Sequence, residues 1–405
     1  MERVDTIVIG AGQAGLAASF FLTQHGREHV VLEHGAVGET WRASRWDGFF
    51  LNTPNWSLQL PGGEYGGDQP DAFAPLGEAI AYLEDYARSF SAPVRERVEV
   101  QALRSRNNRY LIETADGEHE ARNVVVATGA FQQPRPAFPG AESAAVDLQL
   151  TTNEYRRPEQ LPAGSVLVVG GGQSGCQIAD ELLRAGRGVY LAAGRCAWFP
   201  RRHRGRDFVS WALEVGLLDE TVDSLPSPAA RLACNPPISG NDGGHDCHPR
   251  GSPGEVPSSS DVSRGSTTGS PASERESSRR SQRATSSQTE SLPGSTATSP
   301  STVSTLATRK SMSAARRRSP TRPRSTSRRR KSQTILWASG FRPDYAWIDL
   351  EVTDEHGWPV QRRGVSSFPG LYFVGVHWLH KRKSALFCGV GEDAEHVVTT
   401  LVERS

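Results

Sequence analysis

Two glycine-rich segments of closely similar pattern limit what this chain of 405 residues can fold into. The first reads Ile7-Val-Ile-Gly-Ala-Gly-Gln-Ala-Gly15, and the second reads Leu167-Val-Val-Gly-Gly-Gly-Gln-Ser-Gly175. Each follows a short apolar run typical of a buried parallel strand and precedes a stretch with a helical pattern. The sequence therefore predicts an α/β fold with two Rossmann-like dinucleotide-binding domains.

The first segment has the full context of a dinucleotide fingerprint. Gly10 allows a tight turn, Gly12 lets a pyrophosphate approach the backbone, and Gly15 lets the helix pack on the strand. The helix that follows presents free N–H groups and a positive dipole end to phosphate. Glu33 ends the next apolar run, where a carboxylate accepts hydrogen bonds from ribose hydroxyls. We expect a dinucleotide here, and the structural alternative is a glycine turn in an unrelated α/β fold.

The second segment offers a similar site, but the charge after its second strand is reversed. The glycine loop and helix start contribute Gly170, Gly172, Ser174 and Gly175. Arg195 stands where the first copy has its acid. An arginine suits a 2′-phosphate, whereas a carboxylate suits a free 2′-hydroxyl, so the second site is predicted to bind NADP. Nearby arginines are either further phosphate ligands or solvated surface residues: Arg201, Arg202, Arg204 and Arg206.

The composition changes between residues 248 and 333. Of these 86 residues 24 are Ser, and none is Phe, Trp, Tyr or Ile. Residues 250–331 hold 17 Lys and Arg but only 5 Asp and Glu. The whole chain has 46 Lys and Arg and 45 Asp and Glu, so the rest of the chain has 29 basic and 40 acidic residues. Such a low-complexity segment cannot bury enough apolar area to offset its ordering entropy, and we predict that it interrupts the fold as a disordered stretch.

Three origins of this segment remain open. It is a disordered insertion, a basic arm for nucleic acid or acidic partners, or a stretch translated out of frame between two compensating shifts. The basic arm is the weakest of these, because the segment has no aromatic side chain to stack on bases, and nucleic acid is therefore disfavoured as a partner. The out-of-frame origin would explain why the segment takes the place of strands and a helix that the second domain needs.

Other features exclude several classes of protein. No run approaches the about 20 apolar residues of a membrane-spanning helix, and no signal peptide precedes the first strand, so a cytoplasmic protein is expected. The chain has 5 cysteines and no C-x-x-C pair, which disfavours a disulfide scaffold and a redox-active dithiol. Any redox chemistry then needs a bound cofactor. No metal site is predicted, since the spacing of one group of ligand-type residues matches no zinc pattern: Cys234, His245, Cys247 and His248.

Together these motifs resemble the class B flavoprotein monooxygenases, which include the flavin-containing and Baeyer–Villiger monooxygenases. The fingerprints are joined by Val124-Val-Val-Ala-Thr-Gly129 and closed by Gly370-Leu-Tyr-Phe-Val-Gly375, and Gly38-Glu-Thr-Trp-Arg42 resembles a motif that follows the FAD acid. The resemblance covers about residues 1–246 and 334–405. It implies FAD at the first fingerprint and NADPH at the second, with further cofactor contacts from Trp41, Arg42, Thr128, Gly129 and Gly375.

The resemblance also divides the chain. It implies an FAD-binding domain of residues 1–160 and 334–405 and an NADP-binding domain of residues 161–246, which is incomplete. Residues 247–333 form the Ser/Arg-rich segment between them. Near its end the chain repeats two more of the family's patterns, a second linker at Ala338-Ser-Gly340 and a helix start near the flavin at Gly389-Val-Gly-Glu-Asp393.

The activity implied by the resemblance is the insertion of one oxygen atom from O2 into a small organic substrate by way of a peroxyflavin. Asn55, in Thr53-Pro-Asn-Trp-Ser57, is the candidate catalytic group near the flavin, and a plain Pro-led turn is the alternative for it. Thr151 stands where the family has a signature His. This departure keeps two alternatives open: an NADPH-dependent flavin oxidoreductase or oxidase without oxygenation, and a catalytically impaired relative with a basic arm.

Overall fold

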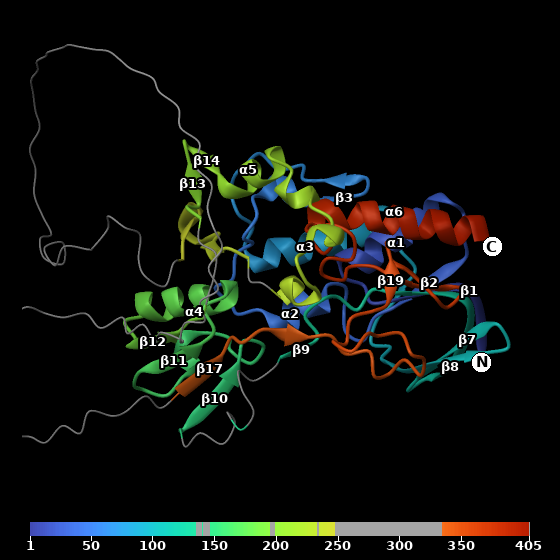
Figure 1. Ribbon diagram of the computed structural model, residues 1–405, viewed down its shortest axis with the longest axis horizontal. Coiled ribbons are helices and arrows are strands. Elements are labelled where there is room, and N and C mark those ends of the chain that lie inside the picture. The colour runs from blue at the N-terminus through green and yellow to red at the C-terminus, as the bar shows by residue number, and fades with distance from the viewer. Residues whose placement is uncertain (135–139, 141–145, 195–198, 233–234, 248–333, 405) are drawn as a thin grey trace, which may run out of the picture. The chain divides into compact units, whose positions relative to one another are not determined.

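The computed structural model describes residues 1–134, 140, 146–194, 199–232, 235–247 and 334–404. Within these residues two largely parallel sheets and the helices packed on them form the fold drawn in Figure 1. The predicted α/β class is confirmed. Arg195 and residues 248–333 lie outside the described residues, and so do the predictions made for them.

The larger sheet has the strand order β19-β20-β21-β8-β1-β2-β5, and β7 and β6 extend from β8 as an antiparallel meander. The strands β21, β8, β1, β2 and β5 run parallel to one another. The bounds of its strands are β1 Glu2–Ile9, β2 His29–Leu32, β5 Val94–Arg95, β6 Val100–Arg106, β7 Arg109–Thr114, β8 Gly117–Val126, β19 Gln361–Arg362, β20 Val365–Ser366 and β21 Leu371–Phe373.

Both faces of the larger sheet are covered. Val8 faces a core shared with the helices α1 (Gln13–Gln24), α3 (Leu76–Ser89) and α6 (Phe387–Arg404). Ile7 and Ile9 face the opposite core, which includes Tyr345 and Ile348 from the loop after β18. Successive residues of a strand point to opposite faces, so the run of four buried residues from Thr6 to Ile9 fits a strand covered on both sides.

The second sheet has the order β10-β17-β11-β12 and is parallel throughout. Its strands are β10 Leu148–Thr151, β11 Val166–Val169, β12 Val189–Ala192 and β17 Thr334–Trp337, and the helix α4 (Gln173–Arg184) follows β11. The predicted division assigned residues 148–151 and 334–337 to the FAD-binding domain, but both strands pair in this second sheet. A short apolar strand does not reveal its partner, because pairing depends on tertiary contacts.

Shorter elements connect these layers. The pair β9 with β18 is notable because it joins the segment after β8 to the segment after β17 by antiparallel pairing. The remaining strands are β3 Gln59–Leu60, β4 Gly63–Glu64, β9 Gln133–Pro134, β13 Arg202–His203, β14 Arg206–Asp207, β15 Ile238–Ser239, β16 His245–Asp246 and β18 Phe341–Arg342. The remaining helices are α2 Glu39–Ser44, α5 Phe208–Glu214 and the 3-10 turns Asn55–Ser57, Pro158–Gln160, Leu217–Asp219, Val222–Ser224, Pro228–Leu232 and Asn241–Gly243.

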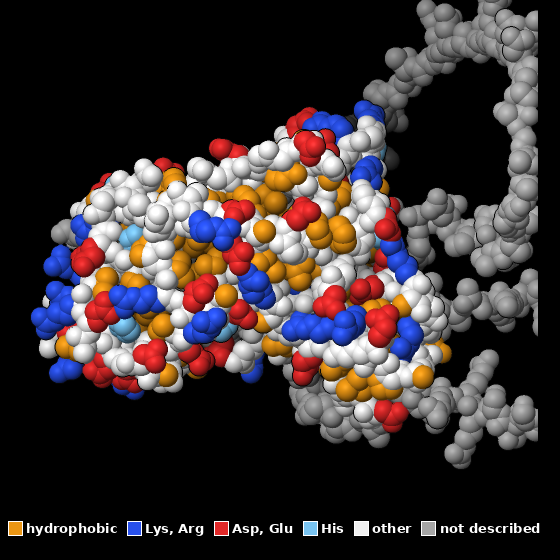
Figure 2. All heavy atoms as spheres, turned by 180° about the vertical axis from the view of Figure 1, so that it is seen from behind, with side chains coloured by type: hydrophobic (Ala, Val, Ile, Leu, Met, Phe, Trp, Pro, Cys, Tyr) orange, Lys and Arg blue, Asp and Glu red, His pale blue; other side chains and the backbone are white. Residues whose placement is uncertain are grey.

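The surface of the described residues carries mixed charge. On the face drawn in Figure 2, Lys and Arg side chains lie interspersed with Asp and Glu side chains. None of the helices in the described part of the chain is both long and apolar enough to cross a lipid bilayer.

Candidate functional site

The first fingerprint forms a tight turn that only glycine can make. Gly10 has a φ of +105°, and a Cβ built on it would lie 2.7 Å from the carbonyl oxygen of Ala127. A Cβ on Gly15 would lie 1.8 Å from the carbonyl oxygen of Gly10, so helix α1 packs directly on the turn. A Cβ on Gly12 would meet no atom within 4 Å. The space in front of the α1 N-terminus is therefore open, which fits a pyrophosphate.

Glu33 is buried at the end of β2 and holds this turn in place. Its carboxylate accepts hydrogen bonds from the backbone amides of Ala11 at 2.6 Å and Gly35 at 3.1 Å, and from the ring of His34 at 2.8 Å. Burial opposes ionisation, but these hydrogen bonds outweigh it and keep the pKa of Glu33 below its usual range. An ionised carboxylate accepts a strong hydrogen bond from a ribose hydroxyl.

Trp41 links the segment after β2 to two helix starts. Its indole N–H donates to the Gln13 side chain at 3.1 Å, and Gln13 in turn donates to the carbonyl of Ala385 at 3.2 Å. The Trp41 ring stacks on Phe387 with ring centroids 5.5 Å apart. The predicted contact residue Arg42 instead forms an ion pair with Glu84 of α3. Trp41 thus lies between α1 and α6, whereas Arg42 is used to hold α2 against α3.

We call the glycine turn of each fingerprint, with the helix start that follows it, a cradle. The linker after β8 and the end of β21 complete the first cradle. The side-chain amide of Gln132 donates to the Thr128 hydroxyl at 2.8 Å and to the Gly129 carbonyl at 3.0 Å. Gly129 has a φ of +81° and open space at its Cβ position. A Cβ on Gly375 would lie 2.5 Å from the Cβ of Ala14, so the chain passes closely over helix α1. These predicted residues therefore converge on the N-terminal end of α1.

The second fingerprint repeats the geometry of the first. Gly170 has a φ of +120°, and its Cβ position lies 2.1 Å from the carbonyl oxygen of Ala338 in the second linker. A Cβ on Gly175 would lie 2.0 Å from the Gly170 carbonyl oxygen. Gly172 caps helix α4, whose first turn includes Ser174 and no acidic residue. This helix start can also accept a phosphate.

The arginines that follow the second fingerprint serve mainly to hold the chain together. Arg201 is buried, pairs with Asp207 at 2.6 Å and lies over the Phe73 ring at 4.2 Å. Arg202 donates to the carbonyls of Gly243 and Gly244. Arg206 pairs with Glu214 at 2.5 Å. Arg204 is exposed and is the one arginine of this group without an ion pair or hydrogen bond in the described residues. The group therefore offers little to a 2′-phosphate.

Asn55 is buried, with 3% of its surface exposed, in the 3-10 turn after Pro54. Its amide nitrogen donates to the Tyr65 hydroxyl at 3.3 Å and to the Gln69 carbonyl at 3.1 Å. Its side-chain oxygen has no hydrogen-bond partner in the described residues. Since buried polar atoms are normally paired, this free acceptor fits a site that a ligand completes.

Thr151, the residue in place of the signature His, has a local role. Its backbone amide and its hydroxyl both donate to the Glu154 carboxylate, at 2.7 and 2.8 Å. Such a pairing caps the turn that follows β10 and keeps the side chain engaged within its own loop.

The loop after Gly375 is charged, but its cations are paired with carboxylates. Lys381 and Lys383 bind Asp219 and Glu392, and Arg382 binds Glu220. Burial, followed by the neighbouring charge of Arg382, lowers the pKa of His377 to about 4, so its ring is neutral at physiological pH. The ion pairs already neutralise these cations, so the loop offers little to a phosphate.

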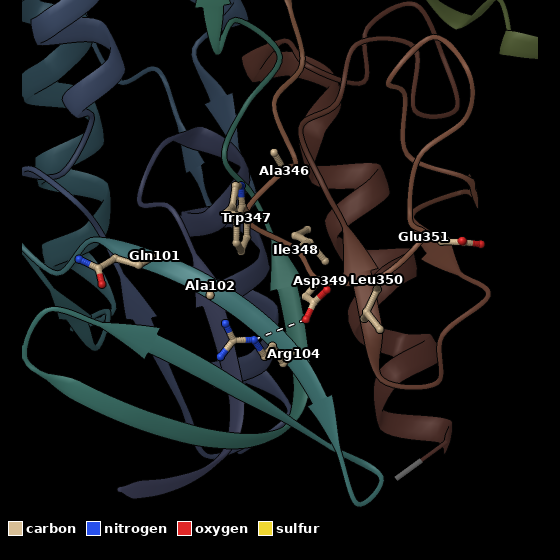
Figure 3. Close-up of a pocket in the computed structure, with 9 residues that line it drawn as sticks. All are labelled: Gln101, Ala102, Arg104, Ala346, Trp347, Ile348, Asp349, Leu350 and Glu351. Carbon is tan, nitrogen blue, oxygen red and sulfur yellow. Dashed lines mark ion pairs between the residues drawn. The ribbon is translucent and has the colours of Figure 1, made fainter.

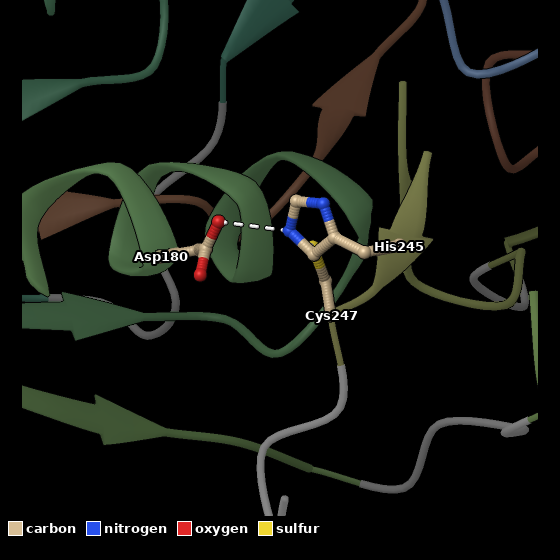
Figure 4. Close-up of side chains that lie close together, drawn as sticks. All are labelled: Asp180, His245 and Cys247. Atoms are coloured by element: carbon tan, nitrogen blue, oxygen red, sulfur yellow. Dashed lines mark hydrogen bonds and ion pairs between the residues drawn. The ribbon is translucent and has the colours of Figure 1, made fainter. Parts of the chain in front are cut away.

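One group of ligand-type side chains comes together among the described residues. The His245 ring lies 3.0 Å from the Asp180 carboxylate and 3.7 Å from the Cys247 sulfur (Figure 4). Arg184 occupies the same place, 3.1 Å from Asp180 and 3.0 Å from the His245 nitrogen. The hydrogen bond to Asp180 raises the pKa of His245 to about 10, and a protonated ring beside a guanidinium repels a metal ion. Cys234 and His248 lie outside the described residues.

One open hollow in the described part of the chain is lined by no residue of either fingerprint. It has a volume of about 600 Å³ and lies between β6 and the 346–351 loop, where Arg104 pairs with Asp349 at 3.5 Å (Figure 3). It is wide open to solvent and shares no residue with the predicted site. This hollow therefore adds no residue to the predicted cofactor sites.

The sequence motifs do not indicate the roles of three residues near the first fingerprint. Gln13 lies inside the fingerprint, but nothing in the pattern indicates that it joins Trp41 to the start of α6. Phe387 and Gln132 belong to no motif, and their roles come from contacts with residues far away in sequence.

Comparison with known proteins agrees with this geometry. A family model described as pyridine nucleotide-disulphide oxidoreductase matches residues 7–207. A protein of Geobacillus kaustophilus described as an uncharacterized oxidoreductase, CzcO-like, is 34% identical over an alignment of 405 positions that covers 99% of each chain. Indole-3-pyruvate monooxygenase YUCCA1 of Oryza sativa is 34% identical over 195 residues, 46% of this chain and 48% of its own length.

The fold is also that of a solved enzyme. A flavin-containing monooxygenase from Stenotrophomonas maltophilia superposes with a TM-score of 0.62 and 21% identity, covering 100% of this chain and 99% of its own. The predicted resemblance is therefore confirmed. This chain belongs to the CzcO-like oxidoreductases, and it resembles the flavin-containing monooxygenases in part of its sequence and in its fold.

Proposed function

We propose that this protein uses NADPH and FAD to insert one oxygen atom of O2 into a small organic substrate. The observation that carries the proposal is the duplicated cradle. Gly10 and Gly170 each turn beneath the carbonyl of a linker alanine, and each leads into a helix whose first turn has no acid. A chain with two such sites can hold a hydride donor and a redox cofactor together.

The first cradle is assigned to FAD. The α1 N-terminus and the open space at Gly12 receive the pyrophosphate, while Glu33 accepts hydrogen bonds from ribose hydroxyls. FAD held there would supply the redox chemistry between NADPH and O2. Trp41, held by Gln13 and Phe387, limits water access to this end of the cradle.

The second cradle is assigned to NADPH. Gly170, Gly172 and Gly175 shape the turn, and Ser174 adds a hydroxyl in the first turn of α4. Arg195 remains the proposed partner of the 2′-phosphate.

Asn55 is proposed as the catalytic polar group. Two hydrogen bonds fix its amide nitrogen, so its unpaired side-chain oxygen is held ready to accept a hydrogen bond. A fixed acceptor in a buried site orients a reacting group at little entropic cost.

The substrate proposed is a small organic molecule, oxidised with the balance of a monooxygenase. One atom of O2 enters the substrate, the other leaves as water, and NADPH supplies the two electrons. The rice relative is named for indole-3-pyruvate, an organic acid, which supports an acid as the substrate class here.

A second candidate function is that of an NADPH oxidase, which releases hydrogen peroxide and oxidises no organic molecule. Thr151 favours this function, because it stands where the family has a signature His. The hydrogen bonds of Thr151 to Glu154 hold its side chain within its own loop. A catalytically impaired relative is the third possibility that the sequence left open.

The test is the visible spectrum of the purified protein before and after anaerobic addition of NADPH. We expect bound flavin whose visible absorbance NADPH bleaches. When air is readmitted in the presence of a substrate, we expect less than one hydrogen peroxide molecule to be released for each NADPH consumed. Peroxide equal to NADPH consumed, with every acid tried, would identify an oxidase. Flavin that NADPH does not reduce would contradict both functions.

A matched pair of variants checks the assignment of the first cradle. Gly12→Ala adds a methyl group where no protein atom lies within 4 Å, so the chain should fold but purify with at least about tenfold less FAD. Gly77→Ala is the control, because its Cβ position is also free of contacts and its φ is not positive, but it lies in the first turn of α3.

A further inference from the structure

Arg45 is a cation without a carboxylate partner in the part of the chain that the structure describes. It follows the last residue of α2, and its guanidinium makes one hydrogen bond, to the Ser44 carbonyl at 3.0 Å. Burial lowers the pKa of Arg45 to about 10. Most other arginines near the site are used in ion pairs, as Arg42 is with Glu84. The other N–H groups of this guanidinium have no hydrogen-bond acceptor among the described residues and are not enclosed, so they can pair with an anion.

Three aromatic rings surround this guanidinium. Its central carbon lies 5.3 Å from the ring centroid of Trp41, 5.6 Å from Phe49 and 5.7 Å from Phe131. We call Arg45 and these rings the aromatic cage. Cation–π attraction offsets part of the cost of burial, but the rings supply no acceptor for the guanidinium N–H groups.

The aromatic cage lies at the cofactor sites. Trp41 stacks on Phe387 and bonds to Gln13, so one wall of the cage is also a wall of the FAD cradle. Phe131 follows the linker after β8 and packs edge-on against Phe341, which follows the linker after β17, with centroids 5.5 Å apart. Ligands of doubly wound sheets bind beyond the carboxyl ends of the strands, and both linkers begin there.

The cage is also accessible and held in shape. Phe131 is 46% exposed, so this wall borders solvent. The Arg156 side chain donates to the backbone carbonyls of Ala43 and Arg45, which fixes the segment that carries the guanidinium. A second guanidinium this close adds positive charge and makes an anion more favourable.

We propose that Arg45 binds the carboxylate of the organic substrate, while the three rings hold its apolar body. The inference deepens the proposed function and rests on it. A guanidinium pairs with a carboxylate through two parallel hydrogen bonds, and flat aromatic walls suit a small apolar group. The phosphates of both dinucleotides have helix starts of their own, at α1 and α4.

The test compares acids with their neutral amides on the full-length, FAD-loaded protein without turnover. The probes are phenylacetate, 3-phenylpropionate and indole-3-acetate, each against its amide, titrated by calorimetry. We expect at least one acid to bind about 10- to 100-fold more tightly than its amide. Arg45→Gln should abolish this difference, and Arg45→Lys, which keeps the charge without the planar fork, should retain only part of it.

Controls separate the possible outcomes. Arg157→Gln removes an exposed arginine nearby and should leave the preference intact. Flavin absorbance and circular dichroism show whether each variant is folded and loaded. The proposal is wrong if acids and amides bind alike or not at all, or if Arg45→Gln weakens NADP⁺ binding more than acid binding, which would identify a phosphate as the anion. Failure of flavin reduction or oxygenation would contradict the proposed function and leave the acid preference unchanged.

Discussion

At the scale of single residues, two buried side-chain oxygens without a hydrogen-bond partner in the described part of the chain stand out. Asn55 and Asp393 each have a buried side-chain oxygen without a hydrogen-bond partner in the described residues. For Asn55 the free oxygen lies in the segment that the family resemblance indicates for the flavin. Asp393 lies in α6, where burial raises the pKa of its carboxyl group to about 6, although a hydrogen bond from Ser384 favours the charged form.

Removing the charge of Asp393 should stabilise the protein at neutral pH. A folded-state pKa of about 6 against 3.8 means that the folded protein binds the proton more tightly, so stability is lost as pH rises from about 4 to 6. Asp393→Asn should gain about 1–3 kcal/mol in the free energy of unfolding at pH 7.5, and about half of that at pH 5. Urea unfolding of the FAD-loaded protein measures both.

The control for this prediction is Glu355→Gln, whose side chain is 86% exposed and should change the free energy little at either pH. Equal gains at both pH values for Asp393→Asn would mean that the carboxyl group is not the cause.

At the scale of elements, a cluster of charges fastens the segment around η4 (Leu217–Asp219) to the start of α6. Lys383, which is 8% exposed, lies 3.0 Å from Asp219 and 2.5 Å from Glu392, and Lys381 binds the same two carboxylates. The backbone amide of Lys383 also donates to the Leu218 carbonyl at 3.2 Å. Hydrogen bonds from Lys381 and then Lys383 lower the pKa of Asp219. This element contact is therefore electrostatic.

Lys383→Met should loosen that contact. Because Asp219 and Glu392 are each more than 40% exposed, water screens the charges that remain, and we expect a loss of about 1–2 kcal/mol instead of the larger cost of a fully buried pair. The carboxyl pKa values are lowered, so the stabilisation is present at neutral pH and fades as pH falls toward 4. Urea titrations at pH 7.5 and 4.5 should show the difference between the two proteins narrowing.

The matched control is Arg88→Met, which breaks a pair with Asp85 in which both side chains are 69% exposed. Its cost should stay below about 0.5 kcal/mol. A similar cost for both variants would mean that burial of Lys383 adds nothing.

At the scale of the whole molecule, the two sheets are covered unequally. The larger sheet is buried on both faces, whereas Leu167 and Val169 of the second sheet are only partly buried on the face opposite α4, and Tyr190 is 46% exposed. Parallel sheets normally have both faces covered. The Geobacillus relative matches 99% of this chain over 99% of its own length, so it has a segment of comparable length where this chain has residues 248–333.

Replacing residues 248–333 by the matching segment of that relative should tighten NADPH binding. If that segment covers the exposed face of the second sheet, we expect the dissociation constant to fall at least about tenfold, while FAD content stays unchanged. Fluorescence titration with NADPH measures the constant, and flavin absorbance measures the FAD content. No change in NADPH affinity would contradict the prediction that the present segment weakens the second domain.

The sequence by itself determined the α/β class, the two glycine turns and the acid after β2, because a turn with positive φ and a short apolar strand are encoded within a few residues. Only the tertiary structure decided that β10 and β17 pair in the second sheet, that the Asn55 oxygen has no partner in the described residues, and that Arg45 lies among Trp41, Phe49 and Phe131. Those features depend on contacts between segments far apart along the chain, which local pattern does not specify.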